Sequence, residues 1–218
     1  MVAAITFPVD LATFFDTLSM QSVSFSITEP QAQTRLADGT VLKAKIGAAL
    51  WQGEVTLVGG EHADMAAIAA KLSVVERAGS SFFIYDPRKP GPAYDPDGSL
   101  LGASTPTILA LNADNKRLSI QGLPTNYELT PGDFLSFTYG SSPTRYALHQ
   151  VVSAAQADGL GQTDLFEVTP LIRPGASTSA AVTLIKPYCK AVLTDLSFGA
   201  GSFRVTTDLS FSFVQTLR

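Results

Sequence analysis

Hydrophobic and polar residues alternate in short runs near the N-terminus. Residues 23–27 read Val-Ser-Phe-Ser-Ile, and residues 50–58 form a longer run of the same kind. Alternation with period two is typical of a strand with one buried face. Between these runs, residues 34–46 contain Asp38-Gly39, a pair that tolerates the positive φ angles of a tight turn. We therefore expect two strands separated by a hairpin.

Residues 64–78 follow a different period. Their apolar residues recur at steps of three and four, and these are Met65, Ile68, Leu72 and Val75. Such a stripe, filled in by alanines, predicts an amphipathic helix packed on a sheet. Gly79 suits the exit from that helix. Residues 81–86 then predict a short strand.

The middle of the chain is bounded by proline. Residues 86–106 hold five prolines and three glycines, which prevents helix and central strand and indicates a domain boundary. Lys186-Pro187 marks a second boundary. Short strands with turn residues between them suggest a small closed barrel or sandwich. They are expected at residues 107–111, 117–123, 134–139, 146–154, 165–169 and 181–185.

The C-terminal tail returns to long alternation. Residues 192–198 and 202–214 predict two strands, with a turn at residues 199–201. Leu209, Phe211 and Phe213 share one face of the second strand and are expected in the core.

These patterns predict a mainly β protein with one helix. Residues 1–88 and 187–218 would form a split β-barrel or sandwich, into which a small β-barrel of residues 100–186 is inserted. Residues 89–99 would be the Pro/Gly-rich connection.

Composition narrows the function. Charged residues make up 16% of the 218 residues, and the net charge is −4 with a pI near 5.1. Phosphate binding needs clustered Lys and Arg, so the charge argues against a protein that wraps nucleic acid. One cysteine excludes an intrachain disulfide. The first residues lack a basic segment, and no apolar run reaches the length of a membrane span, so we expect a soluble protein made in a cytoplasm. A weakly charged surface suits contacts between identical subunits, but it also fits a monomer.

The sequence offers little catalytic chemistry. His62 is expected at an exposed helix start, His149 in a strand, and Cys189 as a small buried residue. The segment from Asp95 to Gly98 lacks the closing Glu of a calcium loop and is interpreted as a turn, as is Asp133. We expect no catalytic residue, cofactor or metal, and a hydrolase built on His149 or Asp133 is the weakest alternative.

The inserted barrel is rich in aromatic residues. Tyr139 and Tyr146 are the candidate ligand-binding residues among them, although core packing explains aromatics of this kind more simply.

The order of these elements resembles the distal tail proteins of long-tailed, siphovirus-like phages and of phage-like gene transfer agents. The resemblance covers most of the chain in organisation. It rests on residues 50–58, the helix at 64–78, residues 82–87 and residues 118–174, notably 129–134 and 167–175.

The resemblance implies a structural protein without catalytic residues. It would form a ring, usually of six copies, that joins the tail tube to the tail tip or baseplate. Its first domain would be tail-tube-like and its insertion similar to an oligonucleotide/oligosaccharide-binding or galectin-like barrel.

The implied partners are further copies, the tail tube protein and tail hub or tip proteins, with DNA as passing cargo and no membrane insertion. The implied location is the tail tip of a particle made in a bacterial cytoplasm. The alternative is a carbohydrate- or receptor-binding module acting through the inserted barrel. The insertion is shorter than in longer family members, which weakens that alternative.

Overall fold

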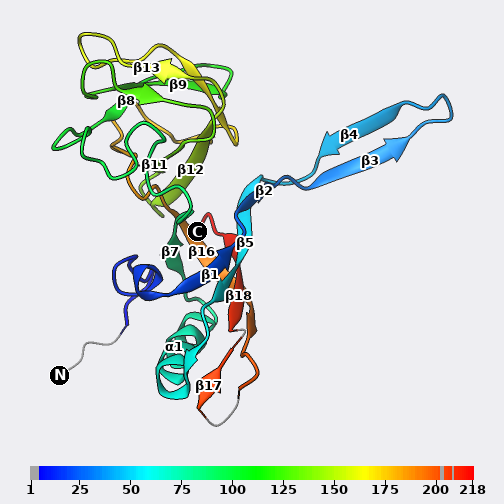
Figure 1. The fold of residues 1–218 in the computed structure, drawn as a ribbon. Coiled ribbons are helices and arrows are strands. Elements are labelled where there is room, and N and C mark those ends of the chain that lie inside the picture. The colour runs from blue at the N-terminus through cyan, green and yellow to red at the C-terminus, as the bar shows by residue number, and fades with distance from the viewer. Residues whose placement is uncertain (1–4, 202–203, 208) are drawn as a thin grey trace. The chain divides into compact units, whose positions relative to one another are not determined.

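The computed structural model describes residues 5–201, 204–207 and 209–218 (Figure 1). Within these residues the protein is mainly β, with one α-helix, α1 (His62–Val75), and a 3-10 turn, η1 (Phe15–Thr17). This confirms the predicted fold class. The strands are β1 (Met20–Val23), β2 (Ser26–Thr28), β3 (Gln31–Arg35), β4 (Val41–Lys45), β5 (Leu50–Leu57), β6 (Gly60–Glu61), β7 (Phe82–Ile84), β8 (Thr107–Leu111), β9 (Arg117–Gln121), β10 (Glu128–Leu129), β11 (Phe134–Tyr139), β12 (Arg145–Val151), β13 (Ala155–Gln156), β14 (Phe166–Thr169), β15 (Val182–Thr183), β16 (Cys189–Ser197), β17 (Val205–Thr206) and β18 (Ser210–Gln215).

The chain divides into two compact units, each built from separate segments. Unit 1 contains Met1–Leu18, Arg77–Ala191 and Thr216–Arg218, and unit 2 contains Ser19–Glu76 and Val192–Gln215. These limits differ from the expected ones, because segments 1–18 and 77–88 group with the barrel strands.

Backbone hydrogen bonds explain why the N-terminal segment belongs to unit 1. Val9 N–H donates to Ser81 O at 2.9 Å, and Phe83 N–H donates to Val9 O at 3.0 Å. Strand β7 also pairs with the first residues of β16, from Cys189 to Ala191.

Unit 1 contains a nearly closed barrel with the strand order β15-β11-β12-β14-β9-β8. An isolated bridge between Thr107 of β8 and Ala181, next to β15, brings the two edge strands together. Closure of this kind satisfies the edge groups that an open sheet would expose. The core of the barrel includes Leu118, Ile120 and Leu135, each 0% exposed.

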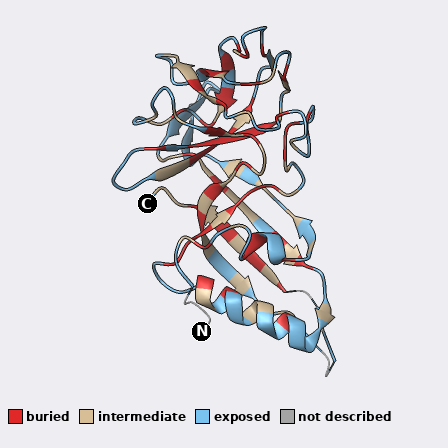
Figure 2. Ribbon diagram, turned by 90° about the vertical axis from the view of Figure 1, so that its left-hand side faces the viewer, coloured by how far each residue is buried: buried red, intermediate tan, exposed pale blue. Residues whose placement is uncertain are grey.

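Unit 2 is a smaller sheet with the strand order β1-β5-β18-β16, in which β2 also pairs with β5. Leu209, Phe211 and Phe213 are each 1% exposed, so their predicted place in the core is confirmed. Helix α1 is largely exposed, with narrow buried and half-buried bands (Figure 2). Its buried residues are Met65, Leu72 and Val75.

The strand expected at residues 23–27 is divided between β1 and β2. At the break, Ser24 N–H donates to Glu54 O at 2.8 Å, and Ser24 Oγ accepts from Glu54 N at 2.8 Å. A Cβ atom at Gly53 would lie 1.9 Å from Ser24 O. Only glycine fits there, so the local distortion depends on a backbone contact that alternation does not reveal.

Several predicted segments have shifted limits, and the helix and the last strand are two examples. Helix α1 begins at His62 and ends at Val75, rather than spanning residues 64–78, and Gly79 follows it at φ +86°. The strand expected at residues 202–214 contains β17, which pairs with β6, and then β18. Residues 202, 203 and 208 of that expected strand lie outside the described residues. So do residues 1–4 of the expected first domain.

Candidate assembly surfaces

The hairpin of β3 and β4 projects from the rest of unit 2 (Figure 1). We call residues 31–46 the arm. Its strands pair with each other over five residue pairs, and both are exposed along their whole length. At the tip, Gly39 has φ +85°, and Asp38 Oδ1 accepts from Thr40 N at 2.9 Å. The predicted hairpin and its turn are therefore confirmed.

The base of the arm is held by polar contacts. Ile46 N–H donates to Pro30 O at 3.0 Å, and Lys45 Nζ lies 2.6 Å from Glu29 Oε1. Gln31 Nε2 also donates to Glu29 Oε2 at 3.0 Å. The hydrogen bond and ion pair to Lys45 hold the pKa of Glu29 below its usual value. These contacts fix the hairpin at its root and leave both of its faces free.

The register gives the arm two chemically different faces, because residues directly opposite in an antiparallel pair share a face. One face, the basic face, pairs Gln31 with Lys45, Gln33 with Lys43 and Arg35 with Val41. The other, the apolar face, pairs Ala32 with Ala44 and Thr34 with Leu42.

Large apolar side chains extend the apolar face towards both ends. Leu36 at the tip and Ile46 at the base continue its alternation. Leu42 is 53% exposed and Ile46 is 69% exposed. This patch has no cover in the described residues of its own unit.

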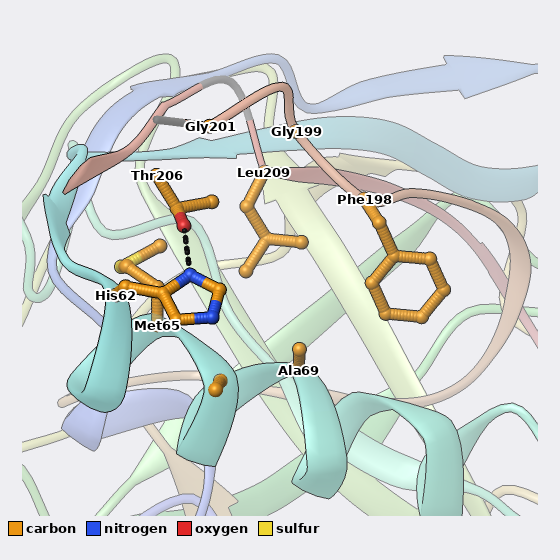
Figure 3. A pocket seen from close by; sticks show the side chains of 9 residues that line it. His62, Met65, Ala69, Phe198, Gly199, Gly201, Thr206 and Leu209 are labelled. Carbon is orange, nitrogen blue, oxygen red and sulfur yellow. Dashed lines mark hydrogen bonds between the residues drawn. The ribbon is translucent and has the colours of Figure 1, made fainter. Parts of the chain in front are cut away.

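A pocket of about 350 Å³ lies between α1 and the segment that follows β16 (Figure 3). We call it the helix pocket. His62 Nδ1 is 3.0 Å from Thr206 Oγ1 at one end, and the Phe198 ring is 56% exposed at the other. The rest of the lining is apolar or backbone. The lining residues are His62, Met65, Ala66, Ala69, Phe198, Gly199, Gly201, Thr206 and Leu209.

The opposite face of the unit 2 sheet carries a shallow polar groove of about 330 Å³. Glu54 is its only charged lining residue among those described. Pairing of Ser212 with Glu54 and of Val214 with Gln52 places these four residues side by side, and three of them carry polar groups. The groove is lined by Ser24, Ser26, Gln52, Gly53, Glu54, Thr194, Ser212, Phe213 and Val214.

The two candidate ligand-binding tyrosines lie on opposite faces of the barrel sheet. Tyr139 pairs with Arg145, whereas Tyr146 pairs with Thr138. Tyr139 is 5% exposed, its hydroxyl has no hydrogen-bond partner among the described residues, and burial raises its pKa. The structure therefore does not bring the two rings together as one platform.

Tyr146 packs in an aromatic cluster within unit 1. Its ring centroid is 4.7 Å from that of Phe83 and 6.0 Å from that of Tyr188. Phe83 and Tyr188 are 4.9 Å apart in an edge-to-face arrangement. Edge-to-face contacts of half-buried rings stabilise packing, but they present no flat stacking surface.

His149 is buried and neutral. Its Nδ1 lies 2.8 Å from Pro170 O, and its ring stacks on Phe137 at 5.2 Å. A carbonyl has no proton, so Nδ1 must donate and Nε2 must be the unprotonated nitrogen. Nε2 has no partner among the described residues. Burial lowers the pKa of His149 to about 4, and Arg173 adds to the effect.

Cys189 and His149 do not combine into a nucleophilic pair. No hydrogen bond joins them among the described residues, and burial raises the pKa of the Cys189 thiol well above its usual value. A thiol held protonated is a poor nucleophile.

The buried carboxylates of unit 1 are used to hold loops. Asp95 accepts hydrogen bonds from Tyr127 Oη at 3.1 Å and from Leu101 N at 2.8 Å. Asp133 accepts from Thr130 N at 2.7 Å and from Ala93 N at 2.9 Å. No three His, Cys, Asp or Glu side chains cluster as a possible metal site within the described ranges.

The sequence predicted the hairpin but missed the helix pocket. The two faces of the arm could have been found from the alternation of Lys43 and Lys45 with Leu42 and Ala44. The pocket could not, because it joins α1 to residues more than a hundred positions later.

The sequence matches no known protein family and is not detectably similar to any curated protein. Among the described residues, no helix combines the length and apolar character needed to cross a bilayer. The fold and surfaces define a mainly β protein of two units with an exposed two-faced arm.

Proposed function

We propose that this chain is a structural subunit that assembles side by side into a closed ring at the distal end of a phage or gene transfer agent tail. The ring, of six copies as the resemblance implies, would link the tail tube to the tail tip or baseplate. The subunit carries out assembly rather than catalysis.

The arm is the observation that carries this proposal. A two-stranded hairpin alone is marginally stable in water, and exposed strand edges with apolar side chains favour pairing with another chain. If an identical neighbour covers the arm with a different surface, the contact is heterologous. Repeated heterologous contacts form a ring when the rotations between successive copies add up to a full turn. The resemblance in the order of elements supports the tail as the setting.

The polar groove supports a bore through which DNA passes. DNA moves freely only past surfaces that do not bind phosphate, and phosphate binding comes from Lys and Arg. The groove has Glu54 as its only described charged residue. We therefore assign this face of unit 2 to the inside of the ring.

The alternative of carbohydrate or receptor binding through the barrel gains no support from the geometry. It relied on Tyr139 and Tyr146, which lie on opposite faces of the sheet, with Tyr139 buried.

The test compares the full chain with a variant that lacks the arm. Residues 31–45 are replaced by Asn-Gly, which closes a hairpin between Pro30 and Ile46. Mass photometry and negative-stain electron microscopy measure assembly, and circular dichroism checks the fold.

We expect rings for the full chain and monomers for the armless variant. Leu160→Ser is the matched control, because Leu160 is 80% exposed and belongs to unit 1 rather than to the arm, so its replacement should leave rings intact. A full chain that stays monomeric at every concentration reached, also when tail tube protein is added, refutes the proposal.

A further inference from the structure

Among its described residues, unit 2 has an exposed apolar face on the arm and a pocket lined mainly by apolar side chains. We infer that the apolar face of the arm docks in the helix pocket of a second copy of this chain. This inference rests on the proposed ring and names the surface that receives the arm.

The first argument is chemical fit. The apolar face presents Leu42 at its centre and continues to Leu36, which is 44% exposed. The helix pocket offers Met65, Leu209 and the half-exposed ring of Phe198. A branched aliphatic side chain loses its exposed surface in such a pocket, which is the main source of affinity at an interface centre.

The second argument is charge. The arm carries three basic residues and one acidic residue: Arg35, Lys43, Lys45 and Asp38. The rest of unit 2 carries two basic and seven acidic residues: Lys71 and Arg204 against Glu29, Glu54, Glu61, Asp64, Glu76, Asp195 and Asp208. Opposite net charges steer one copy towards the next and raise the association rate.

Two acidic residues lie beside the helix pocket, where the basic arm of a second copy would dock. Glu61 and Asp64 are exposed at the start of α1, next to the pocket residues His62 and Met65. With the apolar face buried, the basic face remains outward, where long Lys and Arg side chains can reach neighbouring carboxylates.

Cross-linking tests the contact directly. One variant carries Leu42→Cys and a second carries Ala66→Cys, which lies exposed in the pocket lining. The two are mixed and treated with a short bismaleimide. Cys189 is 0% exposed and its raised pKa keeps it protonated, so it gives little background.

We expect a cross-linked heterodimer between Cys at 42 and Cys at 66. Lys43→Cys is the matched control, because it lies on the basic face of the same strand, and its yield with Ala66→Cys should be several-fold lower. Ser212→Cys tests the polar groove as a rival receiving surface.

A second test fills the pocket without touching the arm. Ala66→Trp places an indole in the pocket lining and should weaken association about tenfold or more, which corresponds to about 1.4 kcal/mol. Ala67→Trp, an exposed position of the same helix outside the lining, should associate like the original chain.

The outcomes separate this inference from the ring itself. Rings that form while Leu42→Cys cross-links to Ser212→Cys, or while Ala66→Trp assembles normally, overturn the inference and leave the ring standing. A chain that never assembles overturns both. A third outcome also overturns the inference. The chain binds duplex DNA, the binding is lost in Lys43→Glu, and Leu42→Cys does not cross-link to Ala66→Cys. The arm is then assigned to nucleic acid instead.

Discussion

Acid should destabilise unit 1 through a single buried histidine. The His149 ring is 1% exposed, donates through Nδ1 to Pro170 O, and has no partner for Nε2 among the described residues. Protonation would place a charge on Nε2 inside the core. The pKa of His149 is therefore lowered from 6.5 to about 4, mainly by burial.

The sign and size follow from proton linkage. Between pH 6.5 and 4 the unfolded chain binds a proton at this histidine and the folded chain does not, so stability falls as pH falls. The free energy of unfolding is highest above pH 6.5, where His149 is neutral in both states. Its fall ends near pH 4, where the folded chain is protonated as well. A shift of about 2.5 pKa units corresponds to about 3 kcal/mol lost from the free energy of unfolding.

Two variants isolate this effect, since the chain has only two histidines. His149→Phe keeps a ring against Phe137 but cannot be protonated, so its unfolding free energy should lose the histidine-dependent slope between pH 6.5 and 4. His62→Gln, at an exposed position of unit 2, should keep the slope of the original chain.

Urea unfolding at a series of pH values measures the slope. Peptide-resolved hydrogen exchange over β12 reports unit 1, and the fluorescence of Trp51, the single tryptophan, reports unit 2. Equal slopes for His149→Phe and the original chain would refute the burial argument. So would a slope that disappears in His62→Gln.

Three further predictions concern buried contacts, each measured as the change in unfolding free energy in urea. Asp95→Ala removes an acceptor shared by Tyr127 and two backbone amides, and it should cost about 2–4 kcal/mol. The control is Asp97→Ala at an exposed position, which should cost about 1 kcal/mol or less. Equal costs would contradict the role of Asp95. Gly53→Ala forces a Cβ into the backbone oxygen of Ser24 and should cost about 2 kcal/mol or more. A neutral result would mean that the break at Ser24 does not depend on this glycine. Tyr139→Phe removes a buried hydroxyl that has no partner among the described residues, and it should be neutral or stabilising by about 1 kcal/mol. Tyr127→Phe removes a hydroxyl that donates to Asp95 and should destabilise the protein. The reverse order would be inconsistent with the assigned hydrogen bonds.

Local periodicity predicted the elements well where one face of an element is buried and the other is exposed. Residues 209–213 alternate strictly, and the structure buries Leu209, Phe211 and Phe213 as expected. Asp38-Gly39 likewise located the turn of the arm, because turns with positive φ prefer glycine and the pair is visible in the sequence.

Prediction was weaker where distant segments decide the structure. The break at Ser24 depends on the opposing Gly53, and neither residue disturbs the alternation of its own strand. Tyr139 and Tyr146 both looked available as aromatic residues, yet the register places one in the core and the other on the opposite face. Cross-strand register and loop packing are not encoded in the period of a single segment.

The two-faced arm also bears on how a free subunit avoids unwanted association. A long hairpin with two apolar faces would pair with any exposed strand and aggregate. Here Lys43 and Lys45 make one face charged. The paired positions of the apolar face are mostly small residues, so Leu42 is the only large aliphatic side chain among them; the small residues are Ala32, Thr34 and Ala44. An interface built on so little apolar area is weak for one contact. In the proposed ring each copy would both give and receive an arm, so a subunit would leave only after both of its contacts break. The proposed assembly would therefore depend on ring closure, because an isolated pair of copies has only one such contact.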